Sequence, residues 1–131
     1  MSAPENLIGR TAADDWGPFV LADERLGRRG AVLTASGELD IATVPEFRDR
    51  LTRWVDAGVD RLVLDLRGVG FMDSVAMAAI IHTRTQLGDA GRMAVVLDGD
   101  SYTRLVFEIA GLPRCLELYE TREEAAAALG L

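Results

Sequence analysis

Two patterns of apolar residues alternate along this chain. Short segments with the apolar pattern and length of strands occupy residues 31–39, 62–66, 93–97 and 116–119. The segments between them carry apolar residues every three or four positions, as amphipathic helices do, over residues 44–57, 74–87, 101–110 and 122–129. This alternation predicts a single α/β domain with about four helices and a mixed, mostly parallel β-sheet.

The N-terminal part is predicted to add a β-hairpin to this sheet. Residues 19–25 alternate in part between apolar and polar positions, and the glycine-bounded segment 27–30 is typical of a turn before the 31–39 strand. Residues 1–18 show no sustained period. We therefore expect a flexible N-terminal extension over residues 1–18 and one domain over residues 19–131.

Local signals mark where helices begin. Thr43 with Glu46, and Thr121 with Glu124, have the spacing of a capping box, in which the threonine hydroxyl accepts a hydrogen bond from a backbone N–H three residues on. Both threonines are therefore predicted N-caps.

Ser101 is expected to cap the 101–110 helix in the same way. The apolar face of that helix is predicted to consist of Leu105, Val106 and Ile109.

The segment around residue 74 is the best candidate for a functional site. Gly68 and Gly70 break the apolar pattern after the 62–66 strand, and Asp73-Ser74 then precedes a helix. Partners and ligands commonly dock at the carboxyl ends of parallel strands, where this hydroxyl would lie. The Ser74 hydroxyl is either an N-cap or a group whose phosphorylation would add about −1.5 to −2 charges without unfolding the helix.

Three motifs resemble the STAS domain family, named for sulfate transporters and anti-sigma factor antagonists. The segment Leu64–Ser74 resembles the family's core signature, Gly37-Glu-Leu-Asp40 resembles the end of an early strand, and Phe107–Leu112 resembles a late helix with the Gly-Leu that follows it. The motifs occur in the family's order, and the resemblance covers about residues 20–129.

The antagonist branch of the family implies a specific function. Such an antagonist binds an anti-sigma factor that is also an ATP-dependent serine kinase of histidine-kinase-like fold, and so releases a sigma factor. Phosphorylation of the serine ends binding, and a serine phosphatase restores it. The resemblance makes Ser74 the phosphoacceptor, with Ser101 and Thr103 as alternatives. The residues expected to bind the partner are Asp40, Asp73, Val75, Ala76, Met77 and Ala78.

The chain departs from the antagonist pattern after the serine. Antagonists commonly have Asp-Ser-Ser-Gly at this place, whereas this chain has Asp73-Ser74-Val75-Ala76. A β-branched side chain and an added Cβ could crowd the surface on which a kinase seats the hydroxyl. The departure favours an alternative function, a constitutive STAS scaffold or accessory subunit of a stress-signalling or lipid-transport complex, without a phosphorylation switch.

A third hypothesis is an enzyme-like Mg²⁺ site at the carboxyl edge of the sheet. Asp40, Asp65 and Asp73 are its candidate ligands, as in receiver domains. However, Asp65 is flanked by leucines within a strand, and the chain lacks the lysine that a receiver domain requires. The single histidine, His82, has no second histidine or cysteine nearby. We therefore expect no catalytic residues, no metal and no cofactor.

Composition and charge narrow the class of partner. The 131 residues are 49% hydrophobic and 27% charged, as in ordinary globular domains. The net charge of −7 argues against nucleic acid or an anionic membrane and favours a partner with a basic docking surface. No apolar run approaches membrane-spanning length, and no secretion signal is recognisable. The single cysteine, Cys115, is expected to be a buried strand thiol, and the chain is expected to be cytoplasmic.

Overall fold

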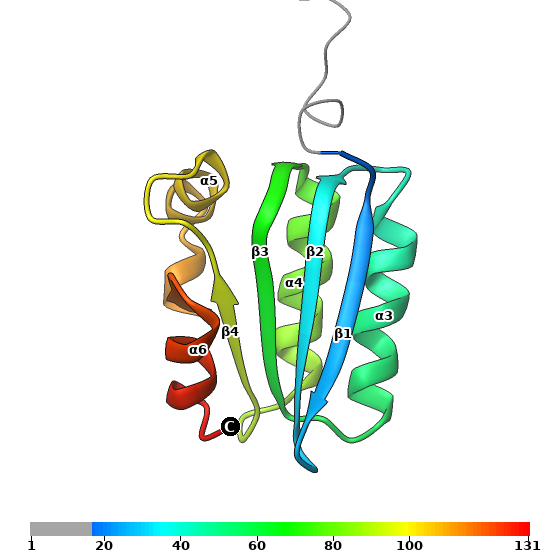
Figure 1. The fold of residues 1–131 in the computed structure, drawn as a ribbon, viewed down its shortest axis with the longest axis vertical. Helices are drawn as coiled ribbons and strands as arrows, with labels where there is room; N and C mark the ends of the chain where they lie inside the picture. Colours follow the sequence, from blue (N-terminus) through cyan, green and yellow to red (C-terminus); the bar gives the residue numbers. More distant parts are fainter. Residues whose placement is uncertain (1–16) are drawn as a thin grey trace, which may run out of the picture.

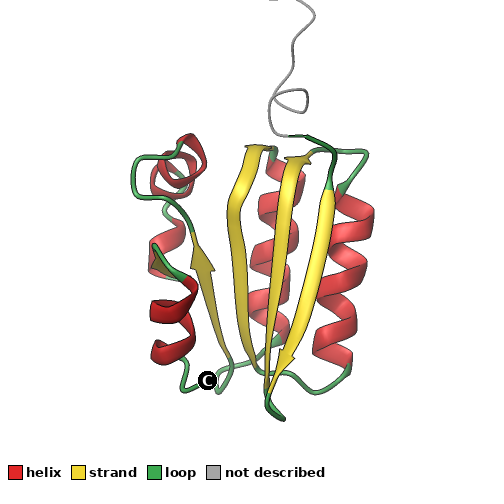
Figure 2. Cartoon of the chain, in the orientation of Figure 1, coloured by secondary structure: helices red, strands yellow, loops and turns green. Residues whose placement is uncertain are grey.

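The structure is a computed structural model that describes residues 17–131, and its centre is a five-stranded β-sheet in the order β1-β2-β3-β4-β5 (Figures 1 and 2). The strands are β1 (Val20–Leu26), β2 (Gly30–Leu39), β3 (Arg61–Met72), β4 (Arg92–Val96) and β5 (Glu117–Tyr119). The first strand pairs with the second in antiparallel fashion, and all later neighbours are parallel. The predicted mixed sheet with an N-terminal hairpin is therefore confirmed.

The described part of the chain has four α-helices and one short 3₁₀ helix; all but the last, which follows β5, connect strands. They are α3 (Val44–Asp56), α4 (Ser74–Gln86), α5 (Tyr102–Ile109), η1 (Leu112–Arg114) and α6 (Arg122–Ala128). Within residues 17–131, no helix is long and apolar enough to cross a membrane. The predicted N-terminal extension, residues 1–18, lies almost entirely outside the described residues and stays a prediction.

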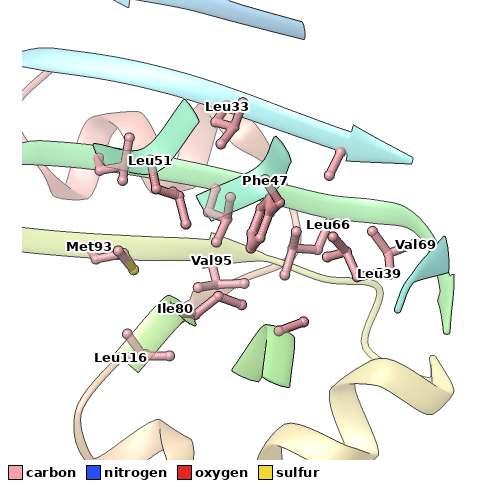
Figure 3. Packing of buried hydrophobic residues seen from close by; sticks show 14 of the residues in the cluster. Leu33, Leu39, Phe47, Leu51, Leu66, Val69, Ile80, Met93, Val95 and Leu116 are labelled. Atoms are coloured by element: carbon pink, nitrogen blue, oxygen red, sulfur yellow. The ribbon is translucent and has the colours of Figure 1, made fainter. Parts of the chain in front are cut away.

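Alternating strand residues bury apolar side chains on both faces of the sheet. The larger cluster lies under α3 and α4, where Phe47 and Ile80 pack against Leu33, Leu64 and other strand residues (Figure 3). The opposite face carries a smaller cluster under α6, made by Val32, Val63, Ala94, Val96, Ala125 and Leu129. Because helices cover both faces, the ends of the parallel strands are the natural place for a site.

The central strand is longer than its apolar run predicts. β3 continues through Gly68 and Gly70 to Met72, so the prediction that these glycines end the strand is wrong. The partner strand β2 shifts its register along this stretch and pairs Gly68 with Ser36. A Cβ atom at Gly68 would lie 2.8 Å from the Ser36 Cβ, so glycine permits a close approach of the two strands here.

The predicted apolar face of α5 is also wrong. Leu105 and Ile109 are 50% and 77% exposed, whereas Thr103 and Phe107 are the buried residues of this helix. A helix of eight residues needs only a narrow stripe to anchor it, and the Phe107 ring enters the larger core cluster. The most apolar stripe of α5 therefore faces away from the domain.

Two of the predicted helix caps are confirmed and one is not. The Ser101 hydroxyl accepts a hydrogen bond from the backbone N–H of Arg104 at 3.0 Å, and Thr121 accepts one from Glu124 at 3.1 Å. Thr43 stands at the N-cap position of α3, but its side chain makes no capping hydrogen bond. Its hydroxyl has a different role, described with the site below.

The position of Cys115 differs from the prediction as well. Cys115 follows η1 and is exposed, and β5 begins only two residues later at Glu117. Its thiol lies 3.5 Å from the carbonyl oxygen of Leu112. The apolar residues after Cys115 suggested a strand thiol, but the turn of η1 places the side chain outside the sheet.

Candidate functional site

The candidate site lies at the carboxyl edge of the sheet, at the end where β2 and β3 finish (the upper end in Figure 1). Only Asp73 separates the end of β3 from the start of α4. The backbone N–H of Asp73 donates to the carbonyl oxygen of Leu39, the last residue of β2, at 3.1 Å. This bond joins the two strand ends, so Asp40 and Asp73 lie at the same edge, as expected for parallel neighbours.

Asp73, and not Ser74, caps α4. Asp73 has an extended backbone, and its Oδ1 accepts hydrogen bonds from the N–H groups of Val75 at 3.0 Å and Ala76 at 3.1 Å. These bonds satisfy N–H groups that have no partner inside the helix, and the carboxylate charge is favourable at a helix N-terminus. The capping interpretation of the Ser74 hydroxyl is therefore wrong.

Ser74 is the first residue of α4 and is exposed. Within residues 17–131, its hydroxyl makes no hydrogen bond to another protein group. The two alternative acceptors are already engaged, since Ser101 caps α5 and the Thr103 hydroxyl donates to the carbonyl oxygen of Val69 at 3.2 Å. Thr103 is also only 4% exposed. Of the three hydroxyls, Ser74 is the one with no structural role in the described fold.

The other residues expected to bind a partner differ in accessibility. Val75 is 40% exposed, Ala78 is exposed and Met77 is partly buried. Ala76 is fully buried in the larger core cluster, so its expected direct contact with a partner is wrong. The added Cβ of Ala76 points into the domain. Of the departures from the antagonist pattern, only the side chain of Val75 changes the surface beside Ser74.

Asp40 organises the turn between β2 and α3. Its Oδ1 accepts hydrogen bonds from the N–H groups of Ala42 at 3.0 Å and Thr43 at 3.1 Å. The Thr43 hydroxyl donates to the carbonyl oxygen of Glu38 at 2.7 Å and accepts from the N–H of Asp40 at 3.0 Å. The predicted Thr43 cap fails because this hydroxyl is used by the turn. The carboxylates of Asp40 and Asp73 thus each fix the backbone at the start of the helix that follows, α3 and α4 respectively.

Asp65 does not join these two carboxylates. It lies in the middle of β3, only 3% exposed, and its Oδ2 pairs with Arg67 Nη2 at 2.8 Å and with Arg122 Nε of α6 at 2.9 Å. Burial raises the pKa of this carboxyl, but the hydrogen bonds from Arg67 and Arg122 outweigh burial and hold the pKa below its usual value. Asp65 therefore stays ionised and ties α6 to the sheet.

The three carboxylates of the Mg²⁺ hypothesis are consequently not brought together as a ligand set. In the part of the chain that the structure describes, no three side chains of the types His, Cys, Asp or Glu are grouped so that they could hold a metal ion. Asp40 holds the turn between β2 and α3, Asp73 caps α4, and Asp65 pairs with Arg67 and Arg122.

The carboxyl edge also carries apolar residues that the sequence reasoning missed. Ile41, two residues after the end of β2, is 79% exposed, and Phe71, the last but one residue of β3, is 38% exposed. Both fall outside the periodic apolar faces on which the predictions were based. We call Ile41, Phe71 and Val75 the apolar edge, because each lies within three residues of the hydrogen bond that joins Leu39 to Asp73.

Comparison with known proteins gives one consistent result. The family model of the STAS domain matches residues 24–125. The anti-sigma-F factor antagonist RsfB of Mycobacterium tuberculosis is 30% identical over 125 residues, which cover 95% of this chain and 91% of RsfB. The crystal structure of an anti-sigma factor antagonist from Mycobacterium paratuberculosis has a TM-score of 0.79 at 27% identity and covers 87% of this chain and 96% of that one.

The anti-sigma factor antagonist SpoIIAA is similar as well, and it has been solved in two forms. Its unphosphorylated form has a TM-score of 0.70 at 26% identity, covering 87% of this chain and 98% of that one. Its phosphorylated form, from Bacillus, has a TM-score of 0.63 at 28% identity, with 86% and 99% covered. These relatives are named for a protein that they antagonise and not for a reaction, which agrees with a binding module and not an enzyme. The chain belongs to the STAS domain family.

Proposed function

We propose that this chain is an anti-sigma factor antagonist whose binding is switched by phosphorylation of Ser74. The observation that carries the proposal is the exposed Ser74 hydroxyl at the start of α4, with Asp73 and not Ser74 capping the helix. The similarity to RsfB, and to SpoIIAA with its phosphorylated and unphosphorylated forms, supports it.

A phosphate on Ser74 would leave the fold intact. The cap that holds the first turn of α4 comes from Asp73, and the larger core cluster receives Ala76 and Ile80 from α4 but not Ser74. A dianion is also favourable near a helix N-terminus, although Asp73 beside it opposes this effect. The modified chain would therefore differ from the unmodified chain mainly in the charge of one surface.

That surface is suited to a switch because it combines the hydroxyl with apolar contacts. Ile41, Phe71 and Val75 offer apolar area that a partner can cover, and Ser74 directly precedes Val75 at the same edge of the sheet. A dianionic phosphate that a partner covers with apolar side chains costs several kcal/mol, since the group loses its water there.

The proposed partner is an anti-sigma factor that is also a serine kinase of histidine-kinase-like fold, and a serine phosphatase would restore the unmodified state. Asp40, Asp73, Met77 and Ala78 complete the docking face around Ser74. The net charge of −7 favours a partner with basic residues around its contact surface and disfavours nucleic acid. Such a pathway would operate in the cytoplasm.

One observation favours the alternative of a constitutive scaffold or accessory subunit. Val75, directly after Ser74, places an exposed β-branched side chain where antagonists of the family commonly have a small polar residue. A kinase that must enclose the Ser74 hydroxyl would have to accommodate this side chain. In the alternative, the same edge binds its partner and Ser74 is never modified.

The two functions are separated by intact-mass measurement. The chain is incubated with ATP and, in turn, each purified histidine-kinase-like ATPase of the same genome. We expect one of them to add a single phosphate to the wild type and to Ser101→Ala, and none to Ser74→Ala. If Ser74→Ala still gains a phosphate, the switch is elsewhere. If no kinase modifies the wild type, the scaffold function is the better account.

A further inference from the structure

Helix α5 exposes an apolar stripe that the Ser74 docking face does not include. Tyr102, Leu105 and Ile109 are 67%, 50% and 77% exposed. Residues three and four positions apart lie on the same side of a helix, so these side chains form one continuous stripe, here called the α5 stripe. The opposite side of α5 already anchors the helix through Thr103 and Phe107. A contiguous exposed apolar stripe of this kind is typical of a protein-binding surface.

The α5 stripe lies at the same end of the domain as the apolar edge (Figure 1). Helix α5 lies at the same end of the sheet as the start of α4 (Figure 1). The Thr103 hydroxyl bonds the carbonyl oxygen of Val69 in β3, and a hollow between the two elements is lined by Gly70 and Tyr102. Gly70 is followed directly by Phe71 of the apolar edge. A partner that covers this end of the domain could therefore contact both the apolar edge and the α5 stripe.

The size of the α5 stripe excludes it as a complete interface. A stable interface buries roughly 800 Å² on each partner, far more than three side chains supply. Symmetric pairing of two copies through α5 would also bring together two chains of net charge −7. The α5 stripe therefore fits best as one part of a larger contact, and the apolar edge is another part.

The charges around the α5 stripe define the chemistry of its occupant. Asp98 and Asp100 precede α5, Glu108 lies within it, and all three are exposed. The one basic residue of the helix, Arg104, pairs with Glu108 at 3.1 Å. Arg67 of β3 lies near Asp98 and lines the same hollow, but Asp100 has no ion pair among the described residues. The border of the α5 stripe therefore carries more acidic than basic residues, which favours a partner surface with an apolar centre and a lysine or arginine border.

We propose that the partner that docks at Ser74 extends over α5 and covers the α5 stripe with an apolar surface bordered by basic residues. The inference rests on the proposed function, because the occupant is the same anti-sigma factor. It adds a second contact region, outside the phosphorylated segment, that contributes to affinity in the unphosphorylated state.

The test measures the affinity of the unphosphorylated chain for the anti-sigma factor kinase by calorimetry without ATP. Leu105→Gln combined with Ile109→Gln removes the apolar contact from the α5 stripe. Leu131→Gln is the matched control, since Leu131 is 38% exposed and lies at the C-terminus, at the opposite end of the molecule (Figure 1). Circular dichroism and thermal unfolding verify that each variant is folded.

We expect the double variant to bind at least about tenfold more weakly than wild type, and Leu131→Gln to bind as wild type does. Affinity equal to wild type in the double variant would overturn the inference and leave the proposed function standing. If the wild type binds none of the histidine-kinase-like ATPases of its genome, the proposed function fails and the inference falls with it.

The acidic border of the α5 stripe gives an independent readout. Asp98→Asn with Asp100→Asn should slow association with the kinase and weaken its dependence on salt, because rim charges act mainly on the rate of encounter. Unchanged association rates and salt dependence would exclude a basic border on the partner over α5.

Discussion

Asp73 caps α4 and Ser74 does not, so alanine substitutions at these two neighbouring residues should affect the stability of the fold differently. Asp73 Oδ1 accepts two backbone hydrogen bonds at 3.0 and 3.1 Å and places a negative charge at the start of α4. The Ser74 hydroxyl is exposed and plays no part in the cap. Asp73→Ala should therefore destabilise the fold, and Ser74→Ala should not.

The size of the difference follows from these contacts. Loss of an N-cap side chain costs about 1 kcal/mol, and loss of a charge at a helix N-terminus about 0.3–1 kcal/mol more. Asp73→Ala should therefore lower the free energy of unfolding by about 1–2 kcal/mol. Asp73→Asn keeps the acceptor oxygen and loses the charge, so about 0.3–1 kcal/mol is expected. Ser74→Ala should stay within about 0.5 kcal/mol of wild type.

Urea unfolding followed by circular dichroism measures these differences, and Ser101→Ala supplies the matched control. Ser101 has the same side chain as Ser74 but caps α5 with a 3.0 Å hydrogen bond, so its replacement should cost about 1 kcal/mol. If Ser74→Ala is as destabilising as Ser101→Ala, the Ser74 hydroxyl has a structural role. The reasoning that leaves it free for modification would then be refuted.

Three further outcomes follow from the structure. Because the folded-state pKa of Asp65 is lowered, the stabilisation from its carboxylate is present above its unfolded pKa of about 3.9 and is lost as the pH falls through the folded value. Asp65→Asn should lower the free energy of unfolding by about 1–3 kcal/mol at neutral pH, because Arg67 and Arg122 stay partly in water, and should flatten the acid side of the stability–pH curve. Gly37→Ala should lower the melting temperature by several degrees, because Gly37 has a φ of +98° and an added Cβ would lie 2.8 Å from the Phe19 Cα. Gly88→Ala should lower the melting temperature less, because Gly88 also has a positive φ but an added Cβ there would meet no atom within 4 Å. Cys115 should react with a thiol reagent in the native protein at a rate close to that of the unfolded chain, because it is exposed.

The fold was predictable because its elements are distinguished by apolar period alone. Alternating strands and helices gave the order of the elements and the parallel sheet, and the hairpin turn gave the antiparallel edge strand. The end of β3 was not predictable, since Gly68 and Gly70 usually interrupt a strand. Here they let β3 pass close to β2 where the register shifts, and only the neighbouring strand reveals this.

The position of the site could be predicted from the sequence, but the roles of its residues could be predicted only in part. A strand followed by Asp73, Ser74 and a helix placed the hydroxyl at the carboxyl edge. Which of the two adjacent residues caps the helix could not be predicted, because that depends on the direction of each side chain. The prediction of which face of α5 is buried failed for a related reason. Periodicity identifies the apolar stripe of a helix, and it does not say whether that stripe meets the core or, as with Leu105 and Ile109, the solvent.

The central claim is that the charge on one exposed hydroxyl controls partner binding. The direct measurement compares the affinity of unmodified and Ser74-phosphorylated chain for the anti-sigma factor kinase, with the modified chain purified to a single mass and ATP omitted. The account predicts binding by the unmodified chain and affinity weaker by at least about a hundredfold after phosphorylation, equivalent to roughly 2.7 kcal/mol. Equal affinity of the two forms would contradict it.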